Sequence, residues 1–325
     1  MKILVTGATG FVGSHLVDAL LAGHHEVTAL VRDPAQAQPL ADRGVSLRCG
    51  DLMDPASLRG LADGMDAVAH TAAVLNLPKN PASAYAANVE GTRNLAEAVS
   101  GSSIHRFVHI SSVAAIGIRN VHRIDENFAC NPDLAYGKSK LEVDRYLIQQ
   151  SAHGLPVVIL RPPTVYGPRE RYNFLSLCRA ILSRRFMLIG SGQNRVDFCW
   201  VGNLVQAILL ALERGRPGGL YLIADEPVLP FRETVETLAS LLGRPIPRLR
   251  LPTALAYAVS VPLAALGRLT GREVPLYPKR VRTMASDMCF DLSKAKAELG
   301  YAPRGPFREL ARETIEWSRQ NGLLG

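Results

Sequence analysis

The first thirteen residues constrain the fold of this chain more than any other segment. Residues 2–6 form a short apolar run typical of a buried strand, and Gly7, Gly10 and Gly13 follow at equal spacing. From Phe11 the apolar residues recur with a helical period. Such a turn brings bare backbone close to a phosphate, and the helix N-terminus supplies unpaired N–H groups. The segment therefore predicts a strand, a turn and a helix that bind the pyrophosphate of a dinucleotide.

Strand and helix patterns alternate through the first half of the chain. We expect further strands at residues 27–31, 46–50, 67–71, 107–110 and 157–160, and helices at 14–22, 55–62, 83–100 and 136–152. This alternation predicts an α/β fold of the Rossmann type, with a doubly wound parallel sheet covered by helices on both faces. Ligands of such sheets bind beyond the carboxyl ends of the strands.

The pattern is less regular after Pro168. Helices are expected at residues 172–185 and 203–213, a strand at 220–223, and helices with proline-rich connections from residue 230. We therefore expect an NADP-binding Rossmann domain over residues 1–168, with return segments near 196–225. Residues 169–195 and 226–325 would form a smaller substrate-binding region.

Charge and cysteine content limit the classes of partner. Lys and Arg number 37 against 29 Asp and Glu, and these charges are distributed along the chain without long runs, so we expect no nucleic acid. The five cysteines show no C-x-x-C spacing, which predicts no metal site and no disulfide framework. Together with the lack of a signal-peptide pattern, this predicts a reducing, cytoplasmic location.

The end of the second expected strand bears on cofactor choice. An acidic residue there would bind the ribose 2′-hydroxyl of NAD, whereas a cation suits the 2′-phosphate of NADP. Val31 stands where the acid would be, and Arg32 follows it. We therefore predict NADP(H). The alternative is a solvated Arg32 that pairs with Asp33.

Two further strand ends could contact the cofactor. After the third strand, the Asp51 carboxylate could accept from the adenine amino group while Leu52 packs on the ring. The alternative is a helix N-cap region, because Asp54 and Pro55 follow. After the fourth strand, small residues at 72–73 let the backbone pass close to the cofactor ribose, and His70 is interpreted as a packed strand residue.

A serine, a tyrosine and a lysine indicate the class of chemistry. Ser111 and Ser112 end the fifth strand, and Tyr136 and Lys140 lie four residues apart on the expected helix after it. Tyrosine has an ordinary pKa near 10, and a nearby ammonium favours its phenolate, which makes proton transfer practicable. Lys140 can also hold the nicotinamide ribose, and Ser112 can hydrogen-bond the substrate oxygen.

At this point the sequence resembles the extended short-chain dehydrogenase/reductase family. The matching stretches are TGATGFVG from Thr6, NVEGT from Asn88, Ser111-Ser112, YGKSK from Tyr136, LRPPTVYGP from Leu160 and DLSKAKAELGY from Asp291. The resemblance implies Ser112, Tyr136 and Lys140 as the catalytic set; Ser112 is chosen over Ser111 by counting back from Gly117. The predicted cofactor contacts are Gly7, Thr9, Gly10, Phe11, Val12, Gly13, Arg32, Asp51, Leu52, Ala72, Ala73, Tyr136, Lys140 and Pro163.

Departures from the family patterns limit the choice of branch within the family. Sugar-nucleotide epimerases of the family carry an asparagine where this chain has Thr164, and an aspartate where it has Asn203. The Val-Gly-Asn stretch at 201–203 resembles the 3β-hydroxysteroid dehydrogenase and dihydroflavonol reductase branch. Arg195, however, matches a position that binds diphosphate in the epimerases, so a nucleotide-sugar 4-epimerase stays as an alternative. A non-catalytic NADP-binding sensor or scaffold is a second alternative.

The apolar stretch Leu251–Leu266 supports an apolar small-molecule substrate. It could line a pocket for a flat or lipid-like molecule, or lie on a membrane with the nearby basic residues at the headgroups. It could equally form a core helix or a subunit contact. We therefore predict a carbonyl reductase or alcohol dehydrogenase that acts on an apolar cyclic or lipid-like ketone or secondary alcohol. The resemblance also implies a homodimer formed by the helices that start near Asn88 and Tyr136.

Overall fold

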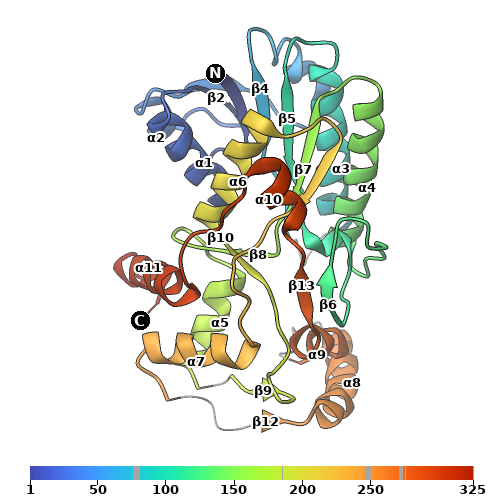
Figure 1. The fold of residues 1–325 in the computed structure, drawn as a ribbon, viewed down its shortest axis with the longest axis vertical. Helices are drawn as coiled ribbons and strands as arrows, with labels where there is room; N and C mark the ends of the chain where they lie inside the picture. The colour runs from blue at the N-terminus through green and yellow to red at the C-terminus, as the bar shows by residue number, and fades with distance from the viewer. Residues whose placement is uncertain (76–80, 185, 246–249, 271–273, 275, 325) are drawn as a thin grey trace.

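The computed structural model describes residues 1–75, 81–184, 186–245, 250–270, 274 and 276–324 (Figure 1). A seven-stranded sheet in the order β11-β7-β5-β4-β1-β2-β3 occupies the upper part, and all of its strand pairs are parallel. Its strands are β1 (Lys2–Thr6), β2 (Glu26–Val31), β3 (Ser46–Cys49), β4 (Ala67–His70), β5 (Arg106–Ile110), β7 (Val157–Arg161) and β11 (Gly219–Leu222). This is the predicted doubly wound Rossmann fold, with its switch point between β1 and β4.

Helices cover both faces of this sheet because its strands are apolar on both sides. Ile3 and Val5 of β1 belong to one hydrophobic cluster and Leu4 to another, as the two-residue period of a strand requires. The first cluster includes side chains of α1 (Phe11–Ala22), α6 (Val201–Arg214) and α10 (Ser293–Leu299). The second includes side chains of α3 (Pro81–Val99) and α4 (Ala135–Ala152).

One predicted helix of this half is wrong. The helix expected at residues 55–62 is a single 3₁₀ turn, η1 (Pro55–Leu58). Arg59 is already extended, and Gly60 follows with a positive φ of 68°, a conformation that ends helices. The short α2 (Gln38–Ala41) lies between β2 and β3.

The lower part of the molecule is built from short strand pairs and helices (Figure 1). The strand pairs are β8 (Thr164–Tyr166) with β10 (Phe198–Trp200), β9 (Leu188–Ile189) with β12 (Arg250–Leu251), and β6 (Val121–Ile124) with β13 (Met288–Phe290). A third cluster, around the stacked rings of Tyr166 and Phe174, is shared by α5 (Asn173–Leu182), α7 (Phe231–Leu241) and α11 (Phe307–Gln320). The remaining helices, α8 (Thr253–Thr270) and α9 (Pro278–Ala285), lie at the end of the molecule away from the sheet.

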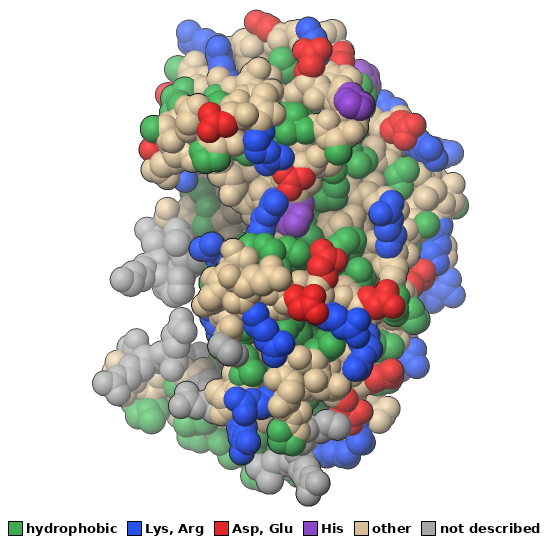
Figure 2. All heavy atoms as spheres, turned by 90° about the vertical axis from the view of Figure 1, so that its left-hand side faces the viewer, with side chains coloured by type: hydrophobic (Ala, Val, Ile, Leu, Met, Phe, Trp, Pro, Cys, Tyr) green, Lys and Arg blue, Asp and Glu red, His purple; other side chains and the backbone are tan. Residues whose placement is uncertain are grey.

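The surface carries both signs of charge. Figure 2 shows basic and acidic side chains interspersed over the upper and lower halves of the face it draws. Among the described residues, no helix is both long enough and apolar enough to cross a membrane.

Candidate functional site

The glycine turn forms a cradle that side chains would fill. Gly7 has a φ of +75°, and a Cβ added to it would stand 2.7 Å from the backbone nitrogen of Ala72. A Cβ on Gly13 would stand 2.0 Å from the Gly7 carbonyl oxygen. Helix α1 starts after Gly10 with no side-chain cap and no acidic residue in its first turn. Its first N–H groups therefore face a phosphate site at the positive end of the helix dipole, so the residues present fit a dinucleotide.

Thr9 and Gly10 are exposed on this cradle, whereas Phe11 and Val12 are partly buried. At the end of β2, Arg32 is also exposed. The Asp33 carboxylate accepts hydrogen bonds from Ala35 N (3.0 Å) and from the Gln36 side chain (2.7 Å). Within the described ranges no ion pair joins Arg32 to Asp33, so the exposed guanidinium is not held by its neighbour.

The segment after β3 distinguishes the two roles that the sequence left open for Asp51, a cofactor contact and a helix N-cap. Asp54 is the N-cap of η1, accepting from Ala56 N at 3.1 Å. Asp51 instead accepts from Met53 N at 2.9 Å. The Leu52 side chain packs against the second cluster. Asp51 is therefore not needed as the helix cap.

Asn88 of α3 fixes the loop that follows β4. Its side chain accepts from Val74 N at 2.8 Å and donates to Val74 O at 2.9 Å. This clamp holds the backbone of Ala72 and Ala73, of which the first is partly buried and the second exposed. In the sequence, Asn88 stands out only as a motif residue. Its spacing from Thr92 on one helix face is the signal that could have indicated a positioning role.

His70 is the packed strand residue that the sequence predicted. It is buried, and its Nδ1 lies 2.6 Å from the Thr6 hydroxyl and its Nε2 2.9 Å from the Thr92 hydroxyl. Because Thr92 donates its own proton to Asn88 O, it accepts from Nε2. His70 is therefore the neutral Nε2–H tautomer, and burial lowers its pKa to about 3.

The structure brings Ser112 and Tyr136 together. Ser112 follows β5 and caps the short turn η2 (Val113–Ala115), accepting from Ala114 N at 3.1 Å. Tyr136 lies in the first turn of α4, with its hydroxyl close enough to the Ser112 side chain for that side chain to lower the tyrosine pKa. Ser111 points elsewhere and donates to Asp144 at 2.9 Å. Ser112 is thus the member of the serine pair that lies beside the tyrosine.

Burial dominates the electrostatics of Tyr136 and Lys140. It raises the pKa of Tyr136 to about 12, which the Ser112 side chain only partly opposes. Lys140, one turn further along α4, is buried and donates to the Ile110 carbonyl at 2.8 Å. Burial lowers its pKa to about 8, against the opposing effect of Asp144. The phenol, rather than the phenolate that the sequence argument expected Lys140 to favour, is thus the neutral-pH form.

Asp144 is the site residue that sequence reasoning missed. Its Oδ2 accepts from Ser111 Oγ and from Arg161 Nε, each at 2.9 Å, and its side chain is fully buried. Burial raises the pKa of this carboxyl, and the Arg161 guanidinium opposes the change. The network joins α4 to β5 and β7 and so fixes the helix that carries Tyr136. The signal was present, because Asp144 continues the four-residue spacing of Tyr136 and Lys140.

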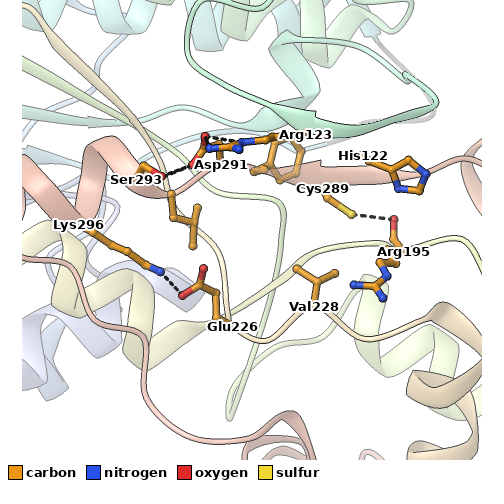
Figure 3. A pocket seen from close by; sticks show the side chains of 11 residues that line it. His122, Arg123, Arg195, Glu226, Val228, Cys289, Asp291, Ser293 and Lys296 are labelled. Atoms are coloured by element: carbon orange, nitrogen blue, oxygen red, sulfur yellow. Dashed lines mark hydrogen bonds and ion pairs between the residues drawn. The ribbon is translucent and has the colours of Figure 1, made fainter.

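Arg195 lies in a different place. It lines a pocket of about 500 Å³ together with Arg123, Glu226, Asp291 and Lys296, and Figure 3 shows the two ion pairs on its wall, Arg123 with Asp291 and Lys296 with Glu226. None of the predicted catalytic or cofactor residues lines this pocket. The structure therefore does not place Arg195 in a common pocket with the tyrosine.

Pro163 and Asn203 are both held within the fold. Pro163 is partly buried between β7 and β8. Asn203 is fully buried and donates to Asp225 at 2.7 Å, which ties α6 to the end of β11. Within the described part of the chain, no group of three His, Cys, Asp or Glu side chains could hold a metal ion.

Comparison with known proteins places the chain among dinucleotide-binding enzymes. The model of the NAD dependent epimerase/dehydratase family matches residues 3–224. A sterol demethylase protein B of Methylococcus capsulatus is 29% identical, with all of both chains covered. An undecaprenol-diphosphate-linked N-acetylglucosamine 4-epimerase of Escherichia coli O157:H7 is also 29% identical, over 93% of this chain and 91% of that one. The crystal structure of a UDP-glucuronic acid 4-epimerase from Bacillus cereus with NAD covers 99% of each chain, at 25% identity and a TM-score of 0.76.

Proposed function

We propose that this chain, which belongs to the NAD dependent epimerase/dehydratase family, is an NADP(H)-dependent reductase of ketones or dehydrogenase of secondary alcohols. The observation that carries the proposal is the placement of Tyr136 beside Ser112, with Lys140 one helical turn away on α4. A phenol beside a serine hydroxyl is arranged to exchange a proton with a carbonyl oxygen. The nicotinamide, when bound, supplies or accepts the hydride.

The proton step belongs to the residues of this chain. With its pKa raised to about 12, Tyr136 carries its proton at neutral pH and can donate it to the oxygen of a ketone. Ser112 would hydrogen-bond the same oxygen and so hold it beside the phenol. In the oxidation direction, the deprotonated Tyr136 would accept the hydroxyl proton of the alcohol and become the phenol again.

Cofactor binding would divide among four groups of residues. The glycine turn and the start of α1, including Thr9, Phe11 and Val12, would hold the pyrophosphate. Asp51 and Leu52 would contact the adenine; Ala72, Ala73, Pro163 and Lys140 would lie at the nicotinamide end. Arg32 would select NADP over NAD, because a guanidinium binds the 2′-phosphate in two-point fashion.

An apolar substrate fits both the sequence markers and the named relatives. Thr164 and Asn203 stand where the epimerases carry asparagine and aspartate, and Asn203 is committed to Asp225. The names of two relatives include a sterol and undecaprenol, each a large apolar group. We therefore infer a cyclic or lipid-like ketone or alcohol as the substrate class.

A nucleotide-sugar 4-epimerase is the second candidate, because the fold is similar to that of a UDP-glucuronic acid 4-epimerase. The placement of Arg195 in a pocket without Tyr136 counts against it. A non-catalytic sensor is the third candidate, and the presence of Ser112, Tyr136 and Lys140 together at one site counts against that.

The experiment that tests the choice is thermal-shift screening of the NADPH-bound protein. One panel holds sterol and flavonoid ketones, and the other holds UDP- and dTDP-sugars. Stabilisation grows with the logarithm of ligand concentration over Kd, so a saturable site is recognised by its titration. A shift with an apolar ketone, followed by NADPH oxidation, supports the proposal. A shift only with a nucleotide sugar, lost in Arg195→Ala, would replace it with the epimerase.

A further inference from the structure

The segment that includes α8 and α9 is strongly basic. Residues 244–282 contain eight cationic residues and one acidic residue, a net charge of +7, whereas the whole chain carries +8. The eight cations are Arg244, Arg248, Arg250, Arg268, Arg272, Lys279, Arg280 and Arg282.

The same segment exposes large apolar side chains. Of the fourteen large hydrophobic side chains that are exposed in the described part of the chain, seven lie between residues 255 and 277. Leu269 is 85% exposed, Val261 59% and Leu266 53%. Scattered apolar residues are ordinary on a protein surface, but such clustering marks a contact site.

Helix α8 buries small residues and exposes large apolar ones, whereas an amphipathic helix usually buries its large apolar side chains. The residues it buries are small, namely Ala256, Ser260 and Gly267. Its larger apolar side chains, such as Val261 and Leu269, face outward instead. The inner side packs on α9 in a small cluster with Ile189 and Val281. Removing these outward side chains from water would be favourable by about 25 cal/mol for each Å² of apolar area. The isolated chain leaves this free energy unused.

We propose that the outer face of α8 docks on an anionic lipid bilayer, whose negative charge complements the net positive charge of residues 244–282. The exposed apolar side chains of α8 would enter the interface, and the anionic surface would attract the basic segment. A helix of this kind lies in the plane of the membrane without crossing it.

The charge decides against a second copy of the chain as the occupant. A two-fold contact places the same patch on both subunits, so two segments of net charge +7 would face each other. An anionic surface neutralises that charge instead. The exposure of Leu269 also argues against an enclosed substrate pocket as the destination of this face.

The docking face is connected to the catalytic helix. Arg282 of α9 forms an ion pair with Asp133, three residues before Tyr136. If the chain reduces lipid-like ketones as proposed above, substrate dissolved in the bilayer would enter beside α4. This step rests on the proposed function, whereas the docking itself does not.

The test is co-sedimentation of the full chain with vesicles. We expect binding to phosphatidylcholine vesicles that contain phosphatidylglycerol, weaker binding to phosphatidylcholine alone, and a further decrease in high salt. Leu269→Glu and Val261→Glu should each weaken binding at least about tenfold, since each removes about 1.5 kcal/mol or more of apolar burial. Tyr172→Glu, a substitution at a similarly exposed residue of the α5 N-cap, should leave it unchanged.

Three outcomes would overturn the docking proposal. These are no sedimentation with either vesicle, equal binding of wild type and Leu269→Glu, and a halved molar mass in Leu269→Glu, which would make the face a subunit contact. Failure of the proposed reductase would be seen separately, as vesicle binding without NADPH oxidation on any ketone.

Discussion

The imidazole rings of His70 and His109 stack with their centroids 5.2 Å apart, on residues that are paired across β4 and β5. Both side chains are buried. Both nitrogens of His70 are hydrogen-bonded to threonines, whereas neither nitrogen of His109 has a partner within the described residues. Replacing His70 would therefore remove two hydrogen bonds, whereas replacing His109 would remove none among the described residues, although both rings are buried side by side.

His109→Leu should reduce the acid sensitivity of the protein. Burial lowers the pKa of His109 well below its ordinary value, so below about pH 6.5 the unfolded chain binds a proton that the folded chain does not. Stability is therefore lost as pH falls, by about 1.4 kcal/mol per pH unit for this group. Urea unfolding at about pH 7 and about pH 5 should show a loss smaller by about 2 kcal/mol in the variant.

His70→Leu is the matched control. It removes a similar titration but also leaves the Thr6 and Thr92 hydroxyls without their partner, so it should be destabilised at neutral pH. Equal losses of stability on acidification in wild type and His109→Leu would show that His109 does not carry this effect.

Tyr136→Phe should lower kcat by about 10²–10⁴-fold, the usual range for a general acid. The dissociation constant for NADPH should change little, because the phenyl ring still fills the same space. Single-turnover NADPH oxidation and fluorescence titration measure the two quantities. Wild-type turnover on the best substrate would remove Tyr136 from the proton step.

Arg32→Ala should weaken NADPH binding and leave NADH binding almost unchanged. A charged hydrogen-bond partner contributes about 1.5–3 kcal/mol, so the NADPH dissociation constant should rise about tenfold or more. Arg48→Ala is the control, since Arg48 is an exposed arginine on the neighbouring strand that donates to Arg59 O. An unchanged ratio of the NADPH and NADH constants in Arg32→Ala would contradict the assignment.

The protein should be a homodimer in solution through α3 and α4. Ile148 is 43% exposed on α4, and Tyr146 of the same helix reaches Glu97 of α3. Ile148→Glu would place a charge in that contact, and light scattering at micromolar concentration should then give half the wild-type mass. A monomeric wild type would refute this prediction.

The strands of the central sheet were predictable because each is a buried apolar run followed by a turn residue. The failure at residues 55–62 has a local cause, since Gly60 ends the turn before a second one can form. Asp144 was missed because its partners, Ser111 and Arg161, are distant in sequence. Residues 251–266 showed another limit: a helix that is apolar all round does not reveal from its sequence which side faces outward.

Side chains near the C-terminus complete the core around the first strand. Phe290 and Tyr301 lie in the same hydrophobic cluster as Ile3 and Val5, and β13 pairs with the distant β6. Contacts of such long sequence separation slow folding. When the ribosome has made the glycine turn, α4 and the seven strands, Phe290 and Tyr301 have not yet been synthesised. The core around the first strand is therefore still incomplete at that stage. During synthesis, cofactor capture should lag behind the cofactor-binding half and wait for residues near 300.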